Sequence, residues 1–438
     1  MKNNRVSIIT LGCSKNTVES ETVAGLFMKN GFELTENLKE TDNIIIHTCS
    51  FIRDAREESH NRIVYAGKLK KANPDLKIFV SGCLSQLLQD KMQDKYPFID
   101  GYVGTGNYYN IVNLIKKQKF FSDTDCVGGV RTFKTRVLSS PLPSAYIKIS
   151  EGCTHGCSYC IIPKLRGKLV SRPIKSITDE AKALVAAGVR ELNIIAQETT
   201  SYGLDIYGKL SLAKLLKKLA EIKDLKWIRL LYAYPSTITK ELLDVIYGSE
   251  NICNYMDIPI QHISKTVLKN MKRPLNTRKI IEDIKTKYPD IILRTSLITG
   301  FPGETERDFK EMVSFVKENY FEHIGIFCYS DQELAPSYKM KNKISEEVME
   351  RRKEILAAEQ FQNIIRNNSL KAGKTFEVLP EYVYKNKIFA RAYFQAPETD
   401  NNIIINKNDK ILTGKFVKVK INGYKDYDLT AVLGDVSR

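Results

Sequence analysis

The sequence predicts a multidomain α/β protein. It would combine an N-terminal parallel α/β sheet domain, a central partial (β/α)6 barrel and a small antiparallel β-barrel at the C-terminal end. Two stretches predict the parallel sheets, because each alternates short apolar segments with helical ones. Short alternating strands and the turn pair Asn422–Gly423 predict the terminal barrel, which would be of the oligonucleotide-binding type. A chain of 438 residues is long enough for about two to four such domains.

The N-terminal domain is expected over residues 4–120. Its three predicted strands, each followed by a helix, are Val6–Thr10, Asn43–Thr48 and Lys77–Gly82. A cysteine lies just past the end of each strand: Cys13, Cys49 and Cys83. Ligands of open α/β sheets bind at that edge, so the three thiols would converge in space. Each could also be a small buried apolar side chain, but their shared placement favours a site.

The central domain is expected over residues 139–370. Turn and linker residues at 120–143 precede it, and Cys126 in that stretch is incidental. The predicted strands of this domain are Ala145–Ser150, Glu191–Gln197, Trp227–Tyr234, Tyr255–Ile260, Ile291–Ile298 and His323–Ser330. Barrels of this kind carry their chemistry at the carboxyl ends of the strands. A long charged helix, about Ser345–Lys371, closes the domain, and the terminal barrel takes residues 371–438.

The composition describes a strongly basic protein, with a formal net charge of +16. A basic surface suits an RNA or ribosomal partner, but it is also compatible with an ordinary solvated surface. No run of about 18 apolar residues exists, and the apolar stretch before Cys13 is too short for a signal peptide, so we expect a cytoplasmic protein without membrane segments. Nine cysteines in a reducing compartment argue for metal binding or catalysis and against a disulfide framework.

The string "EGCTHGCSYCIIP" places three cysteines within eight residues: Cys153, Cys157 and Cys160. Three thiolates can hold three irons of a four-iron, four-sulfide cubane and leave the fourth iron free for a substrate. Gly152 and Gly156 permit the sharp turns that such a loop needs. The alternatives fit less well: a zinc site would have to recruit His155, covalent haem needs a histidine where Ile161 stands, and a thioredoxin-type pair leaves one cysteine unexplained.

The spacing C-x-x-x-C-x-aromatic-C, with Tyr159 as the aromatic residue, resembles that of the radical S-adenosylmethionine enzymes. In that family the open iron chelates S-adenosylmethionine, and an electron from the cluster cleaves it to a 5′-deoxyadenosyl radical. The string "SLITGFPGE" resembles the family's adenine-contacting segment, with Ile298, Gly300 and Glu304 at the matching spacing. It also fits a plain strand-to-helix turn in which Glu304 stabilises the helix start, just as Tyr159 also fits simple packing.

Two cysteine triplets on two α/β domains, followed by a small barrel, resemble the methylthiotransferase family, whose domains are an N-terminal cluster domain, a radical core and a TRAM domain. Its ribosomal-protein branch is the more similar one, on the strings "LGCSKN", "SGCLSQ", "AQETTSYG", "WIRLLYAYP", "YMDIPIQHISKTVLKNMKRP", "RAYFQAPETDN" and "YDLTAVLGD". The tRNA branch usually carries "LGCQMN" and "LGQNVNSY" at the first and third of these. Glu198 departs from the ribosomal-protein branch, where Asp is usual.

The resemblance implies insertion of a methylthio group at the β carbon of an aspartate in small-subunit ribosomal protein twelve, on or near the ribosome. It implies two 4Fe-4S clusters: a radical-forming one on Cys153, Cys157 and Cys160, and a sulfur-delivering one on Cys13, Cys49 and Cys83. These six cysteines are the expected catalytic and metal-binding residues. One S-adenosylmethionine would supply the methyl group and another the radical, with cofactor contacts from Tyr159, Glu198, Ile298, Gly300 and Glu304.

The same resemblance implies a monomer that works with separate reductant and sulfur donor proteins. Two other functions remain open at this point. The first is a tRNA methylthiotransferase that forms 2-methylthio adenosine near the anticodon, since a basic charge suits tRNA equally well. The second is a non-enzymatic, metal-bearing RNA-binding module, because a fold such as the terminal barrel does not by itself define a function.

Overall fold

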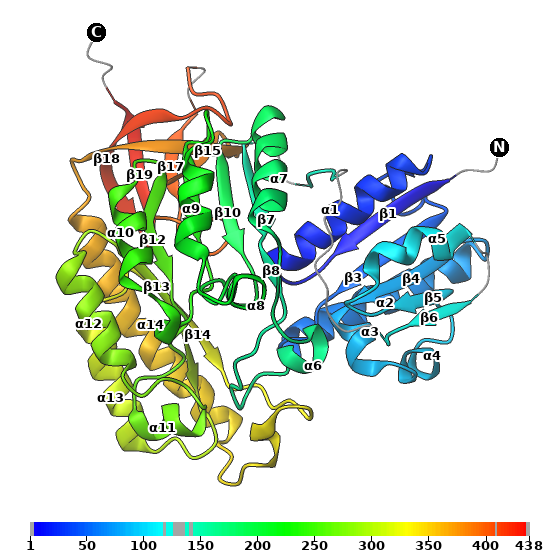
Figure 1. The fold of residues 1–438 in the computed structure, drawn as a ribbon, viewed down its shortest axis with the longest axis horizontal. Coiled ribbons are helices and arrows are strands. Elements are labelled where there is room, and N and C mark those ends of the chain that lie inside the picture. Colours follow the sequence, from blue (N-terminus) through cyan, green and yellow to red (C-terminus); the bar gives the residue numbers. More distant parts are fainter. Residues whose placement is uncertain (1–3, 117–119, 126–135, 140–142, 408–409, 435–438) are drawn as a thin grey trace.

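The computed structural model describes residues 4–116, 120–125, 136–139, 143–407 and 410–434. Within them the chain forms three parts, shown in Figure 1: an N-terminal α/β sheet in blue and cyan, a larger α/β core mainly in green and yellow, and a small barrel in orange and red. Two six-stranded sheets, each wholly parallel, and one closed barrel confirm the predicted fold class. No helix of the described residues is long and apolar enough to cross a bilayer.

The N-terminal sheet has the strand order β2-β1-β3-β4-β5-β6. Its strands are β1 (Arg5–Thr10), β2 (Glu33–Leu34), β3 (Asn43–Thr48), β4 (Lys77–Gly82), β5 (Gly101–Val103) and β6 (Phe121–Asp123). Its helices are α1 (Ser14–Lys29), α2 (Arg53–Ala72), α3 (Cys83–Leu88), α4 (Lys91–Lys95) and α5 (Ile111–Lys116). Apolar side chains alternate across β3, since Ile44 and Ile46 pack with α2 while Ile45 packs with α1 and α5. Both faces of this sheet are therefore covered.

The stretch predicted as a linker begins differently. Its first residues form β6, which pairs with β5 at the edge of the N-terminal sheet, so the linker prediction is wrong for these residues. Three residues give too short a pattern to distinguish a strand from a loop. Cys126, predicted to be incidental, lies outside the described residues.

The core sheet has the strand order β14-β13-β12-β11-β10-β7. Its strands are β7 (Ser144–Lys148), β10 (Glu191–Ile195), β11 (Trp227–Leu230), β12 (Ile252–Asp257), β13 (Ile292–Thr299) and β14 (His323–Cys328). A short ribbon of β8 (Ser150–Glu151) and β9 (Val170–Ser171) leaves β7. The helices are α6 (Ile162–Arg166), α7 (Ile174–Ala186), α8 (Leu204–Tyr207), α9 (Leu212–Ala220), α10 (Lys240–Gly248), α11 (Lys265–Asn270), α12 (Thr277–Lys287) and α13 (Glu306–Lys317).

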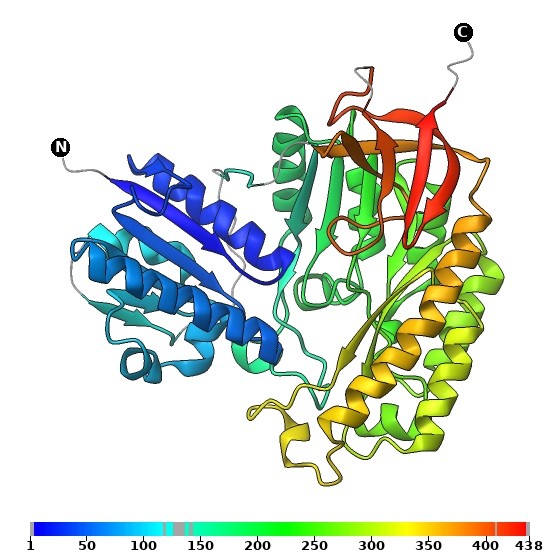
Figure 2. The same cartoon turned by 180° about the vertical axis from the view of Figure 1, so that it is seen from behind.

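The long helix α14 (Glu346–Ser369) runs along the core and leads to the barrel, as Figure 2 shows. The barrel strands are β15 (Thr375–Tyr384), β16 (Lys387–Ala392), β17 (Ile403–Asn406), β18 (Val417–Lys425) and β19 (Asp428–Leu433). Pairing is antiparallel except between β17 and β19. The barrel contacts the core through Glu191, Trp227 and His323, the first residues of their strands, so it covers the amino edge of the core sheet.

Candidate functional site

The three N-terminal cysteines lie just past the ends of adjacent strands, because β1, β3 and β4 are neighbours in the sheet. Cys13 precedes α1, Cys49 directly follows β3, and Cys83 begins α3. Burial raises the pKa of Cys49, and the neighbouring thiols of Cys13 and Cys83 raise it further, so the three thiols lie in one cluster. We name Cys13, Cys49 and Cys83 the N-terminal triplet. The structure therefore brings together the cysteines that the sequence places at three strand ends.

Two glycines permit this close approach. A Cβ on Gly12 would lie 2.4 Å from the Cys49 Cβ, and one on Gly82 would lie 2.7 Å from the Thr48 carbonyl oxygen. Both have a positive φ, of 90° and 98°, which side-chain-bearing residues rarely adopt. The side-chain amide of Asn16 connects the ends of β1 and β3 by donating to the carbonyls of Leu11 and Thr48, at 2.7 and 3.0 Å.

The second set of cysteines, Cys153, Cys157 and Cys160, lies in the loop between β8 and α6. We name it the central triplet. The loop is held closed by backbone bonds from Cys153 N to the Gly167 carbonyl and from Cys160 N to the Cys157 carbonyl, both 3.1 Å. Gly152 is required here, because a Cβ on it would meet the Lys168 carbonyl at 2.1 Å. The motif thus folds into a compact loop at the carboxyl edge of the core sheet.

The thiols of both triplets are poorly solvated. Burial raises the pKa of Cys49 and of Cys160 to about 12, and that of Cys153 to about 11. Binding a metal replaces the thiol protons and offsets that penalty. One guanidinium accompanies each triplet: Arg166 Nη2 lies 3.3 Å from the Cys83 sulfur, and Arg273 Nη1 lies 3.8 Å from the Cys157 sulfur. These cations suit a bound group that is anionic overall.

The donor sets distinguish between kinds of metal site. Among the described residues, no three His, Cys, Asp or Glu side chains are placed to share a single metal ion. A cubane does not need three ligands around one metal ion, because each thiolate binds its own iron. The rival zinc site would need His155, whose Nε2 instead lies 3.2 Å from Glu198 and whose ring stacks on Tyr234 with 3.6 Å between ring centroids. Two triplets of thiols fit two cubanes with one free iron each.

Glu198 is buried beside the central triplet. It accepts hydrogen bonds from the backbone N–H groups of Thr200 and Ser201, at 2.5 and 3.0 Å, and faces His155. Burial raises the pKa of its carboxyl, but these hydrogen bonds outweigh burial and hold it below its ordinary value. The longer carboxylate therefore has partners in its own loop and one, His155, in the loop of the central triplet.

The segment predicted to contact adenine divides into two parts. Ile298 joins Tyr159 in an apolar cluster around Phe301, next to the central triplet. Glu304 accepts from the N–H groups of Gly300 and Phe301 and pairs with Arg352 at 2.8 Å. It does not cap α13.

The start of α13 has its own cap. Thr305 and Asp308 form a capping box there, so the hydrogen-bonding cap of this helix does not come from Glu304. Gly300 leaves no room for a side chain, since a Cβ on it would meet Met349 at 2.0 Å. The segment thus keeps a fixed shape beside the central triplet.

A buried charge network that sequence analysis missed joins the two triplets. Lys148 Nζ lies 2.6 Å from both Glu19 and Glu151, and Arg166 pairs with the same two carboxylates. All four side chains are almost completely buried. Burial raises the pKa of Glu19, but Arg166 and Lys148 outweigh it and hold that pKa well below the ordinary range. The Glu19 carboxylate also lies 2.9 Å from His47 Nε2. Residues of α1, β3, β7 and α6 therefore meet at one point.

The network occupies the junction of two domains. Glu19 belongs to α1 of the N-terminal domain, whereas the other three members belong to the core. Both views place α1 beside the start of the core, next to β7 and β8 (Figures 1 and 2). Arg166 contacts Cys83 of the N-terminal triplet and ends α6, the helix that follows the loop of the central triplet, so both triplets border this junction.

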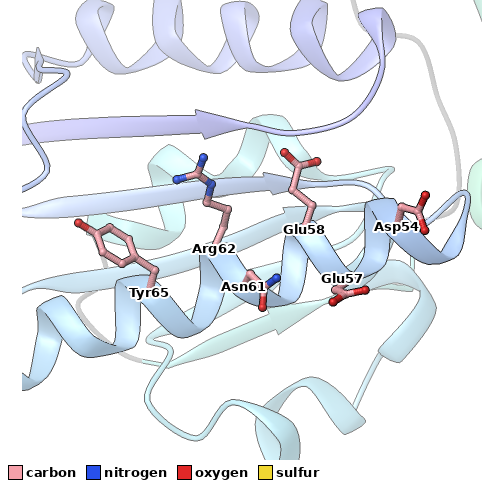
Figure 3. A pocket seen from close by; sticks show the side chains of 6 residues that line it. All are labelled: Asp54, Glu57, Glu58, Asn61, Arg62 and Tyr65. Atoms are coloured by element: carbon pink, nitrogen blue, oxygen red, sulfur yellow. The ribbon is translucent and has the colours of Figure 1, made fainter.

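A surface hollow elsewhere is not the site. Figure 3 shows it along α2, where all its lining side chains lie: Asp54, Glu57, Glu58, Asn61, Arg62 and Tyr65. None of the predicted site residues lines it, and a single helix face gives it only one wall. We assign it no part in the chemistry.

The three parts of the chain match three family models. Residues 5–104 match the "Uncharacterized protein family UPF0004", residues 147–316 the "Radical SAM superfamily", and residues 372–433 the "TRAM domain". A radical S-adenosylmethionine methyltransferase, TsrM from Kitasatospora setae, shares the fold with a TM-score of 0.56 at 14% identity, over 76% of this chain and 77% of that one. The parallel sheet with its three-cysteine loop thus defines a radical S-adenosylmethionine enzyme.

Curated relatives narrow the class further. The chain is 47% identical to "Ribosomal protein uS12 methylthiotransferase RimO" of Endomicrobium trichonymphae, over 97% of each protein. It is 42% identical to the protein of the same name from Clostridioides difficile strain 630, over 99% of this chain and 98% of the relative. The chain belongs to the RimO family of methylthiotransferases.

Proposed function

We propose that this protein inserts a methylthio group at the β carbon of an aspartate in small-subunit ribosomal protein uS12, giving 3-methylthioaspartate. The names of its relatives in the RimO family give ribosomal protein uS12, at up to 47% identity over almost the whole chain. The single observation that supports the proposal is the placement of two cysteine triplets at one buried junction, with Arg166 against Cys83 and at the end of α6, the helix that follows the central triplet.

The chemistry explains why two triplets are needed. A β C–H bond is barely acidic, so a side-chain base cannot open it at a useful rate. When bound, two 4Fe-4S clusters and S-adenosylmethionine supply the radical, the sulfur and the methyl group for this step. The chain supplies the two sets of thiols, the cations that balance their charge and the rigid junction that keeps them at one distance.

We assign the central triplet to the radical-forming cluster and the N-terminal triplet to the sulfur-delivering cluster. S-adenosylmethionine would lie against Tyr159, Ile298 and Gly300, beside the central triplet. Glu198 and Glu304 would act on it through the loops that they close, since their carboxylates bond backbone N–H groups. The N-terminal cluster domain would span residues 4–120, the radical core residues 139–370, and the TRAM domain residues 371–438.

We expect the protein to act as a monomer in the cytoplasm, close to ribosomes, with separate reductant and sulfur donor proteins. The decisive experiment compares the mass of uS12 from a wild-type strain and from a strain that lacks the gene. Loss of the methylthio mass in the deletion strain, restored by the wild-type gene, is the expected result. An unchanged uS12 would overturn the proposal.

A tRNA substrate is the second candidate, because a net charge of +16 favours RNA as much as a ribosomal protein. The same two strains settle it by nucleoside analysis of total tRNA. Loss of 2-methylthio adenosine derivatives in the deletion strain, with uS12 unchanged, would favour the tRNA function. A protein that forms no 5′-deoxyadenosine after anaerobic reconstitution and reduction would instead be a binding module.

A further inference from the structure

Within the described residues, the two edge strands of the core sheet differ in how they are covered. At one edge, α1 of the N-terminal domain packs against β7 (Figure 1), and four of the five β7 residues are buried. At the other edge, β14 pairs with β13 alone in this part of the chain. All six β14 residues are at least partly exposed, whereas every residue of β10 and β11 is buried. The hydrogen-bonding edge of β14 is therefore free to pair with another strand.

The sequence of β14 lacks the usual protection of an exposed edge. Natural edge strands are very short, or carry lysines, prolines or bulges that keep other chains from pairing with them. The strand His323–Cys328 reads "HIGIFC" and contains none of Lys, Arg, Asp, Glu or Pro. Its six residues pair with β13 without a shift in register, so no bulge turns the edge away. An edge of this kind is a template for the addition of a strand.

A cavity of about 480 Å³ lies beside the first half of this edge. Its walls come mainly from β14, α14 and residues 399–402 of the barrel, and Ile326, Ala357 and Ile364 give it an apolar side. Pockets that bind ligands usually measure roughly 300–1,000 Å³, so the cavity is large enough for one. It joins the start of the free edge to the barrel.

Two side-chain acceptors at the wall of this cavity lack partners. Gln360 is 4% exposed; its Nε2 donates to the Glu322 carbonyl at 3.0 Å, while its Oε1 has no partner among the described residues. Asn401 Nδ2 donates to the Tyr427 carbonyl at 2.6 Å, and within the same residues its buried Oδ1 is also unpartnered. A buried acceptor without a donor is costly. A ligand with N–H donors and apolar side chains would offset that cost, and an extended peptide supplies both.

The other end of β14 reaches the two triplets. Tyr329, directly after the strand, shares an apolar cluster with Tyr159 of the central loop. Gln332 Nε2 donates at 3.0 Å to the carbonyl of Phe51, which lies two residues after Cys49. The six residues of the strand, at about 3.3 Å each, span about 20 Å. A chain that pairs along this edge would run between the barrel and the site of the chemistry.

We propose that an extended segment of the substrate polypeptide binds β14 as an added strand, and that Gln360 and Asn401 accept hydrogen bonds from one end of that segment in the cavity. This proposal rests on the proposed function, which makes uS12 the polypeptide whose aspartate must be held near the triplets. Main-chain hydrogen bonds supply the affinity in such strand addition. The backbone of a tRNA has no ladder of N–H and C=O groups, so this mode of binding suits a protein substrate.

The test measures amide hydrogen exchange in the reconstituted, full-length protein, alone and with purified uS12. Peptides that cover β14 should exchange about tenfold more slowly in the complex, because the added strand takes up their N–H groups. Peptides that cover β7 are the internal control and should not change. A uS12 complex with unchanged exchange in β14 would overturn the proposal. Slowing caused by tRNA, or by raising the protein concentration without uS12, would also overturn it, because a nucleic acid or a second copy would then be the occupant.

A charged edge gives an independent measurement. Phe327→Lys places a cation on β14 and should weaken the binding of uS12 about tenfold. Tyr65→Lys on α2 is the matched control, because Phe327 and Tyr65 are both 43% exposed, and it should bind uS12 as the wild type does. Equal affinities of the two variants would contradict the proposal, and if Phe327→Lys does not fold, the exchange measurement on the wild type decides alone. Absence of uS12 binding to the wild type would overturn the proposal, whereas the proposed function is tested separately by the mass of uS12 in the two strains.

Discussion

The carboxylate of Glu191 connects the terminal barrel to the core. Its Oε2 lies 2.6 Å from Arg391 of β16, and its Oε1 accepts from Arg229 of β11 at 3.1 Å. All three side chains are essentially fully buried. Burial alone would raise the pKa of Glu191, but Arg391 and Arg229 outweigh it and lower the pKa from 4.5 to about 2. The ion pair is therefore part of what holds the barrel on the core.

The magnitude and the sign follow from linkage. A pKa difference of about 2.5 at 1.36 kcal/mol for each unit amounts to about 3 kcal/mol. Because the pKa is lower in the folded protein, this contribution is fully present above pH 4.5 and is lost as pH falls from 4.5 to about 2. Glu191→Gln leaves two buried guanidiniums short of a carboxylate, so we expect a loss of about 3–5 kcal/mol at pH 7.

Urea unfolding at a series of pH values measures this. Trp227, the only tryptophan, stacks edge-on against Phe416 of the barrel with 4.6 Å between ring centroids, so its fluorescence reports on the same interface. The gap between wild type and Glu191→Gln should close by about 3 kcal/mol between pH 4.5 and pH 2. Glu377→Gln removes the exposed ion pair with Lys226 at this interface, and it should cost under about 1 kcal/mol. Acid profiles that stay parallel would refute the reasoning.

Further predictions concern the two triplets and the junction between them. Arg166→Met leaves Glu19 and Glu151 one cation short, so it should lower the free energy of unfolding in urea by about 3–5 kcal/mol. Adding Glu19→Gln to this variant should restore part of that loss. Full additivity of the losses from the two substitutions would contradict this. Gly12→Ala should displace Cys49 and remove about half of the reconstituted iron, measured by iron analysis, because the new Cβ would lie 2.4 Å from the Cys49 Cβ; a full iron complement would count against it. Alanine at all three positions of the central triplet should abolish 5′-deoxyadenosine formation, measured by chromatography. The same change in the N-terminal triplet should spare that cleavage and stop only sulfur insertion, so loss of cleavage there would show that our division of labour is wrong.

Much of the fold could be predicted because its signals are local. The six long strands of the core and β1, β3 and β4 are apolar runs bounded by turns, and the alternation with helices then requires parallel sheets. The missed strands of the N-terminal sheet, β2, β5 and β6, have two or three residues each, and neighbouring strands define them more than their own sequence does. The same limit explains why the start of the supposed linker was a strand.

The cysteines of the site could be predicted, but most of its charged residues could not. Spacing reveals the central triplet, and strand ends reveal the N-terminal one. Glu19 and Arg166 are 147 positions apart in the chain, and each alone looks like a solvated charge. Tertiary contacts created these signals.

The chemistry of the junction follows from the kind of contact that builds it. An apolar interface between two α/β domains could slide by a few tenths of an ångström at little cost, since apolar contacts are not directional. A buried network cannot, because a carboxylate that loses its cation in this setting is left unpaired, and that costs several kcal/mol. Arg166 contacts both Glu19 and the Cys83 sulfur. A shift of α1 against α6 therefore breaks the ion pair and displaces the thiol at the same time. The buried network therefore resists movement of α1 relative to α6, and with it a change in the distance between the two triplets.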